Sequence, residues 1–452
     1  MYVTTKRSWQ VSEREWVLYL LIVVVFAVFA AWLGRFSVTM PMYLVLVGAA
    51  VGPDALGWLD IPTTAAGSEL VLEFTLAMIL FADASTIDLN AVRSDAGLPT
   101  RLLAIGLPLT MLLGAGTAYL LFPDEKLGFA LLMGAILAPT DAALGLPIFT
   151  NPKVPARIRQ ALNVESGLND GLATPLVTLF LAMAVEEQHA EPGAWFLSAL
   201  SQIGLAVVVG VAGGLLGGWL FLTAVRNAWT TPVGQRVGNL GLALGIYWAS
   251  VSVDGNGFVA AFVGGLVFGA ATRYELHEAT DFTEECGAVL STLVWTIFGT
   301  SIAVQLVKSF DARAFIFAIL ALTVVRMIPV AISMIGSGLR TDTVLLMGWL
   351  GPRGLASVVF MLISVEALHE SNKAVDLLVA MAGWAILLSV ILHAVTASPL
   401  AHWYARRLES APPDAAEFLP TAELNAHHQR TSHRTLGSHT VPSKGSQSTA
   451  SS

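Results

Sequence analysis

The chain has 452 residues, of which 55% are hydrophobic and only 12% are charged. The charged fraction is about half of the roughly 25% found in soluble domains, and the mean hydropathy is +0.70. A soluble enzyme or a soluble domain with one anchor is therefore excluded, and an all-α polytopic membrane protein is predicted. The net charge of −8 says little about partners, because many of the acids lie in predicted loops and the tail, but no basic stripe indicates nucleic acid as a partner. The single cysteine, Cys286, excludes an internal disulfide.

Apolar runs long enough to span a bilayer, which takes about 20 residues, recur along the chain after a polar N-terminal tail at residues 1–15. We count about 13 such runs, near residues 16–34, 37–53, 64–83, 101–122, 127–148, 160–184, 194–225, 232–252, 257–272, 286–307, 313–337, 341–366 and 376–400. The first is interpreted as a retained helix, because no small-residue cleavage site of a signal peptide follows it. Residues 16–405 are assigned to the membrane domain and residues 406–452 to a cytoplasmic, disordered tail rich in Ser, Thr, Pro and His.

The distribution of Lys and Arg predicts the orientation of the chain. With an odd number of spans the two termini lie on opposite sides of the membrane. Counted up to Arg407, a cytoplasmic C-terminus places 12 loop and tail cations inside and 7 outside, which agrees with the positive-inside rule. We therefore expect a cytoplasmic C-terminus and an external N-terminus.

Two of the spans are interrupted by Pro, Gly and polar residues. The fifth contains APTDAALGLP at residues 138–147, and the twelfth contains GPRGLAS at residues 351–357. Interrupted helices at matching positions of two inverted halves indicate the binding site of a transporter. Thr140 and Asp141 lie where Pro139 removes a backbone donor, so Asp141 is expected to cap a half-helix. The alternative is a proline kink with one capping Asp and no further role.

The sixth span begins with NVESGLNDGLATP at residues 163–175, which places Glu165, Ser166, Asn169 and Asp170 within six residues. Carboxylates are costly in a bilayer and usually mark ion or proton pathways. The Asp170 carboxylate can bind a dehydrated cation with neutral oxygens from Ser166 and Thr140, or it can bind a proton instead. The alternative is a polar cluster that only holds helices together.

The remaining intramembrane cations need buried partners. They are Arg326 in the eleventh span and Arg353 in the twelfth, and Glu165 and Asp141 are the natural partners. An ion pair with Glu165 is open for either arginine, and Arg353 is also suited to neutralise the carbonyl ends of half-helices. His393 in the last span is interpreted as a packing residue rather than a proton relay.

These motifs, together with GNGFVAAFVGGLVFG at 255–269 and LHAVTASPLA at 392–401, resemble the NhaP-type members of the monovalent cation:proton antiporter-1 family. The resemblance covers residues 16–405 and implies an NhaA/NhaP-like fold of two inverted six-helix repeats with crossed broken helices, assembled as a homodimer. It implies that Asp170, Ser166 and Thr140 hold the transported Na⁺. Asn169 stands where electrogenic relatives carry a second Asp, which implies electroneutral exchange. Asp141, Arg353 and Glu165 are implied as core support, to which the need of Arg326 for a buried partner adds this arginine.

The predicted function is thus an electroneutral antiporter in a cell membrane, exchanging Na⁺, or Li⁺ or K⁺, for H⁺ without a cofactor. A K⁺/H⁺ antiporter of the same mechanism is the first alternative. A passive cation channel would need a continuous polar pore, whereas the polar residues gather near one level. An intramembrane aspartyl protease would use Asp141 and Asp170 as its dyad, but GLND at residues 167–170 is not the GxGD of such enzymes.

Overall fold

The computed structural model describes residues 12–61, 66–87, 97–149, 151–189, 194–273, 275–368 and 371–419, and within them all regular structure is helical. The first half contains α1 (Glu13–Gly34), α2 (Met40–Val51), α3 (Ala66–Thr86), α5 (Leu98–Arg101), η1 (Leu102–Gly106), α6 (Leu107–Leu121), α7 (Leu127–Ile136), η2 (Ala142–Gly145), α8 (Leu146–Phe149) and α9 (Ala156–His189). The second half contains α10 (Ala194–Arg226), α11 (Pro232–Val251), α12 (Gly257–Thr272), α13 (His277–Ile297), η3 (Phe298–Ala303), α14 (Val304–Lys308), α15 (Ala312–Leu322), α16 (Val324–Ser333), α17 (Thr341–Trp349), α18 (Leu355–Ala367), α19 (Asn372–Leu408) and η4 (Ala416–Phe418).

The helices have the length and composition of a membrane protein. Within the described residues, seven continuous helical stretches are long and apolar enough to cross a bilayer, and four shorter helices, α2, α7, α12 and α18, are also apolar. The long apolar helices α1 and α10 expose large side chains such as Val28, Leu216 and Trp219, as expected where lipid covers the surface. The polytopic all-α class is confirmed, whereas the number of about 13 spans and the inverted repeat stay predictions.

Both predicted interruptions are present. Helix α7 ends at Ile136, and the chain is not helical until η2 begins at Ala142. Helix α17 ends at Trp349, and α18 begins at Leu355. A third break, which was not predicted, separates α15 from α16 at Thr323, whose φ and ψ are −111° and −92°. Three membrane segments therefore have free backbone groups at the ends of their half-helices.

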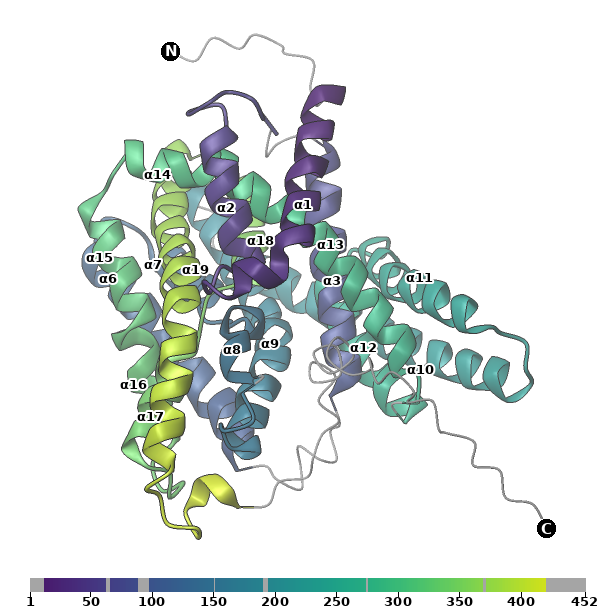
Figure 1. The fold of residues 1–452 in the computed structure, drawn as a ribbon. Helices are drawn as coiled ribbons and strands as arrows, with labels where there is room; N and C mark the ends of the chain where they lie inside the picture. The colour runs from purple at the N-terminus through teal and green to yellow at the C-terminus, as the bar shows by residue number, and fades with distance from the viewer. Residues whose placement is uncertain are drawn as a thin grey trace, which may run out of the picture.

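The helices form two groups, with α9 between them (Figure 1). Helices α10, α11, α12 and α13 gather beside α3, and α12 packs against both α3 and α10. The other group contains α6, α7 and α15 to α19, in which α15 packs along α19 and α7 packs against α6 and α9. Helix α9 also contacts α3, α10 and α12, so the segment with the ESGLNDG motif touches both groups.

The described C-terminal part of the chain is more ordered than expected. Helix α19 continues to Leu408, past the predicted boundary at residue 406, and residues 409–419, which we name the C-terminal strap, fold back onto the helix ends. The Glu417 carboxylate is 1% exposed and accepts hydrogen bonds from the Arg340 amide (2.8 Å) and the Thr343 hydroxyl (2.7 Å). Predicted disorder is thus wrong for residues 406–419, because these long-range contacts leave no trace in local composition; residues 420–452 lie outside the described residues.

Candidate functional site: two crossed helix breaks beside an aspartate

The two interrupted segments cross and are joined through their backbones. The Asp141 amide donates to the Pro352 carbonyl over 2.9 Å. The Ser357 hydroxyl of α18 donates to the carbonyl of Ile136, the last residue of α7, over 2.8 Å. Because these bonds satisfy groups that the helix breaks have freed, the crossing is stable inside the protein.

Asp141 serves two helix starts at the crossing. Its Oδ1 accepts from the Ala143 amide in η2 over 2.8 Å, and its Oδ2 accepts from the Leu355 amide at the start of α18 over 3.4 Å. Negative charge is favoured at such N-terminal ends. A side chain at Gly354 would collide with Asp141, which explains why the segment has glycine there.

Arg353 serves the carbonyl ends of the crossing. Its Nη1 donates to the Ala138 and Pro139 carbonyls over 2.9 and 3.2 Å, just beyond the end of α7. Its Nη2 donates to the Ala321 carbonyl over 3.1 Å, near the end of α15. The guanidinium is fully buried, so a cation neutralises carbonyl ends from two different breaks.

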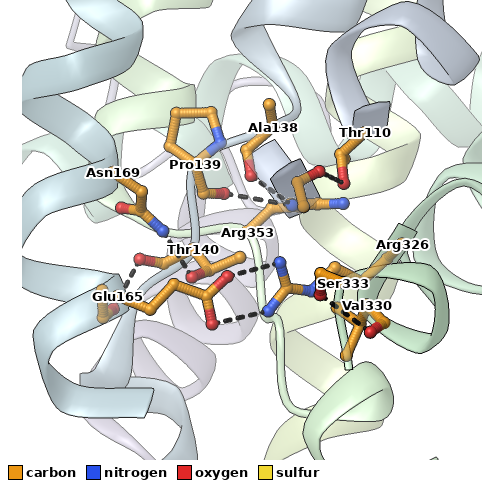
Figure 2. A network of polar contacts seen from close by, with 12 residues as sticks. Thr110, Ala138, Pro139, Thr140, Glu165, Asn169, Arg326, Val330, Ser333 and Arg353 are labelled. Atoms are coloured by element: carbon orange, nitrogen blue, oxygen red, sulfur yellow. Dashed lines mark hydrogen bonds and ion pairs between the residues drawn. The ribbon is translucent and has the colours of Figure 1, made fainter. Parts of the chain in front are cut away.

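Glu165 is paired with Arg326. Arg326 Nη1 and Nη2 donate to the two carboxylate oxygens over 2.6 and 2.9 Å, and the two side chains are 1% and 2% exposed (Figure 2). This bidentate geometry is the strong form of the Arg–carboxylate pair. The Arg326 guanidinium passes so close to Gly351 that a Cβ there would collide with it. Of the two arginines left open by the sequence, Arg326 is the one that binds Glu165.

Three neutral polar residues gather beside the crossing. Ser166 Oγ donates to the Thr140 carbonyl over 2.6 Å, and Asn169 Nδ2 donates to the Thr140 hydroxyl over 2.6 Å. Figure 2 shows Asn169 and Thr140 facing one another, beside the Glu165–Arg326 pair. The Asn169 Oδ1 is buried and has no hydrogen-bond partner in the described structure. It is thus an oxygen free to serve a hard cation.

Asp170 follows Asn169 near the middle of α9 and is partly buried. Within the part of the chain that the structure describes, no Lys or Arg side chain is ion-paired with it. Its carboxylate is close enough to Asp141 for the two charges to repel. The charge of Asp83 in α3 is likewise repelled by those of Asp170 and Glu284 of α13. Asp83 lies at the end of the predicted third span, at residues 64–83, and was not predicted as part of this site.

Sequence reasoning also missed three contributions to the crossing. The Ala321 carbonyl depends on the break at Thr323, for which the sequence has no Pro or Gly signal. Ser389 and His393 of α19 contact the second interrupted segment through hydrogen bonds. His393 is 1% exposed, as a packing residue would be, but its two ring nitrogens face polar partners. Among the described residues, no group of three or more His, Cys, Asp or Glu side chains has a metal-binding arrangement.

Two interrupted helices that cross beside an intramembrane carboxylate define the chain as a secondary transporter of ions rather than an enzyme. A family model described as "Sodium/hydrogen exchanger, transmembrane" matches residues 20–403. This match covers most of the chain, which therefore belongs to the sodium/hydrogen exchanger family.

Among known proteins, the chain is similar to the Na(+)/H(+) antiporter ApNhaP of Aphanothece halophytica, with 25% identity over 374 residues that cover 79% of this chain and 68% of the relative. It is also similar to the K(+)/H(+) antiporter NhaP2 of Shewanella oneidensis, with 28% identity over 238 residues that cover 52% of this chain and 40% of the relative. The solved structure of the sodium proton antiporter MjNhaP1 from Methanocaldococcus jannaschii superposes with a TM-score of 0.69 and 21% identity, over 86% of this chain and 98% of that one. This likeness confirms the antiporter fold.

Proposed function

We propose that the chain is an electroneutral antiporter that exchanges Na⁺ for H⁺, with the Asp170 carboxylate binding either ion. The observation that carries the proposal is the state of this carboxylate. It lies near the middle of a membrane helix, and no protein cation is ion-paired with it among the described residues. A carboxylate at membrane depth needs a counter-charge, and a transported cation or a proton supplies one.

The neighbouring oxygens suit the cation form of the site. Thr140 and Ser166 offer hydroxyl and carbonyl oxygens, and Asn169 offers its unpartnered Oδ1. A hard cation gains from several such oxygens, whereas a proton needs only one oxygen of Asp170. The two ions therefore compete for one carboxylate, and no cofactor takes part.

The charge balance follows from this competition. One Na⁺ or one H⁺ neutralises one carboxylate, so the loaded site has the same net charge in both directions of transport. Asn169 adds an amide beside Asp170 where a second acid would add charge. Exchange is therefore one for one and independent of the membrane voltage.

Alternating access moves the loaded site across the membrane. The crossing of the two breaks, supported by Asp141, Arg353 and the Glu165–Arg326 pair, is the rigid part that carries the site. Within residues 16–405, this core slides past a dimerisation domain, with the C-terminus cytoplasmic, the N-terminus external and a second copy as partner in a cell membrane. The MjNhaP1-like fold and the excess of Lys and Arg in the predicted cytoplasmic segments support this arrangement.

Potassium is the second candidate substrate. The relative from Shewanella oneidensis is named a K(+)/H(+) antiporter, whereas the relative from Aphanothece halophytica is named for Na⁺. The proposed ligands are oxygens, and both ions accept oxygen ligands. The choice between them depends on the size of the site and the cost of dehydrating each ion.

The proposal is tested by reconstituting the protein in liposomes with an imposed pH gradient and a clamped voltage. We expect Na⁺ to collapse the gradient at a rate that does not depend on voltage. Asp170→Asn should remove the response, while Asp376→Asn, the same change at an exposed position of α19, should leave it intact. Exchange at the wild-type rate by a folded Asp170→Asn protein would overturn the mechanism, and a response to K⁺ alone would change the substrate.

A further inference from the structure

We propose that Ser389 and His393 of α19 are positioning residues that hold the second helix break and thereby set the affinity of the cation site. The inference rests on the exchange function proposed above. Neither side chain reaches the transported ion, and both act through the backbone of residues 349–353.

The pair bridges the break between α17 and α18. The Arg353 amide donates to Ser389 Oγ over 2.6 Å, and His393 Nε2 lies 2.8 Å from the carbonyl of Trp349, the last residue of α17. His393 Nδ1 lies 3.2 Å from Ser389 Oγ and 2.9 Å from the Ser389 carbonyl oxygen. Ser389, His393 and Arg353 are at most 1% exposed. Each polar group in this series of hydrogen bonds therefore needs a partner within the protein.

Both ring nitrogens of His393 face polar groups of the protein. The tautomer with its hydrogen on Nε2 donates to the Trp349 carbonyl, and its Nδ1 lies beside the hydroxyl and the carbonyl of Ser389, whose hydroxyl oxygen accepts from the Arg353 amide. The imidazole also stacks on the Trp349 indole, with ring centroids 5.1 Å apart and an interplanar angle of 27°. This stacking holds the ring in the plane from which Nε2 reaches the end of α17.

The crossing thus has two carbonyl ends with different partners. Arg353 serves the carbonyls beyond α7, and His393 serves the carbonyl at the end of α17. Arg353 depends on Ser389, because the hydroxyl fixes the backbone from which the guanidinium extends. A role limited to packing would not place a hydrogen bond at each side of the break.

The held backbone leads directly to the proposed cation ligands. Pro352, next to Arg353, accepts a hydrogen bond from the Asp141 amide over 2.9 Å. Asp141 directly follows Thr140, whose carbonyl and hydroxyl are bonded to Ser166 and Asn169. Loosening the Arg353 amide therefore displaces Thr140. This displacement weakens a cation site of several oxygens but leaves a proton site on Asp170 alone.

The test measures exchange in proteoliposomes for Ser389→Ala and His393→Leu against Ser389→Thr and His393→Gln, which keep a hydroxyl and a donor. Thr396→Ala is the matched control. It removes a 3.0 Å hydrogen bond from the indole of the same Trp349 to the same helix α19, but it leaves the backbone of the break untouched. Each variant is first checked for a monodisperse peak and wild-type yield.

We expect the first two variants to raise the apparent KM for Na⁺ about tenfold, which is about 1.4 kcal/mol of cation affinity. The maximal rate and the apparent affinity for protons should stay within about twofold of wild type, as should all parameters of the two conservative variants and the control. This split separates positioning from a general loss of structure.

An unchanged KM in folded Ser389→Ala and His393→Leu proteins would overturn the inference. Equal changes in the Thr396→Ala control, or equal losses for sodium and protons, would also overturn it. If Ser389→Ala or His393→Leu fails to fold, the conservative variant at the same position is measured in its place. A raised KM for Na⁺ in Ser389→Thr or His393→Gln would also overturn the inference. Failure of the wild type to exchange Na⁺ or K⁺ would instead reject the proposed function.

Discussion

Two carboxylates of the ESGLNDG motif in helix α9, Glu165 and Asp170, lie five positions apart and differ in their partners. Glu165 is almost fully buried, and its carboxylate accepts hydrogen bonds from Nη1 and Nη2 of the Arg326 guanidinium. Asp170 is partly buried and has no ion-paired Lys or Arg among the described residues. Both acids lie at membrane depth, where an isolated charge is costly. The protein neutralises the first with Arg326, and we propose that a transported ion neutralises the second.

The presence or absence of an ion-paired arginine distinguishes a structural acid, such as Glu165, from an acid proposed to bind the transported ion, such as Asp170. A carboxylate that is paired with a protein cation is already neutralised and does not need a second cation. A carboxylate without such a partner needs a proton or a cation from solution to neutralise its charge. Four changes break or sharpen this difference, ordered from the largest expected effect.

The largest effect is expected for removing the charge of the unpaired acid. Asp170→Asn should reduce exchange to the level of empty liposomes, because the amide neither binds a proton in the working range nor balances a cation. The unfolding temperature should be equal to or above that of wild type, because a buried charge without a protein partner has been removed. Fluorescence-detected thermal unfolding together with the gradient assay checks both statements; a large loss of stability would place Asp170 in the structural class.

Removing the partner of the paired acid should act on stability instead. Arg326→Ala leaves Glu165 buried without a counter-charge and should cost about 3–5 kcal/mol. The control is Lys308→Ala, which breaks a 2.6 Å pair with Asp54 between side chains that are 53% and 42% exposed; such pairs contribute only about 0–1 kcal/mol. Chemical unfolding in detergent measures the two losses, and losses of equal size would contradict the assignment of Glu165.

A smaller effect is expected from crowding the pair without removing it. Gly351→Ala places a methyl group against the Arg326 guanidinium and should cost about 1–3 kcal/mol, because the arginine is pushed away from Glu165. Gly116→Ala in α6 has no heavy atom within 4 Å of the new carbon, so it should be neutral or slightly stabilising. The same unfolding assay decides, and equal stability of the two variants would show that Arg326 has room to move.

The smallest effect is expected at the neutral oxygens around Asp170. Ser166→Ala removes the hydrogen bond to the Thr140 carbonyl and should raise the apparent KM for Na⁺ about fivefold, as expected for one neutral hydrogen bond. Ser252→Ala, at an exposed position after α11, serves as the control. Transport kinetics at several Na⁺ concentrations measure the change, and a fall in maximal rate with constant KM would argue against a ligand role for Ser166.

The local sequence predicts two of the three breaks in the membrane helices but not what holds the breaks together. Pro139 and Pro147 mark the first break and Gly351 to Gly354 the second, because these residues disrupt helices by themselves. The choice between Arg326 and Arg353 as partner of Glu165 stayed open, since it depends on which helices pack together. The break at Thr323, the hydrogen bonds of Ser389 and His393, and the place of Asp83 near Asp170 likewise arise only from contacts between distant segments.

The C-terminal strap has a practical consequence for anyone who expresses this protein. The Glu417 carboxylate accepts hydrogen bonds from the Arg340 amide and the Thr343 hydroxyl at the start of α17. Arg157, at the start of α9, donates a hydrogen bond to the Ala416 carbonyl over 2.5 Å. A gene shortened to end at residue 408 would delete both contacts, whereas one ending at residue 419 would keep them. Affinity tags and fluorescent fusions therefore belong after residue 419, where they leave both contacts in place.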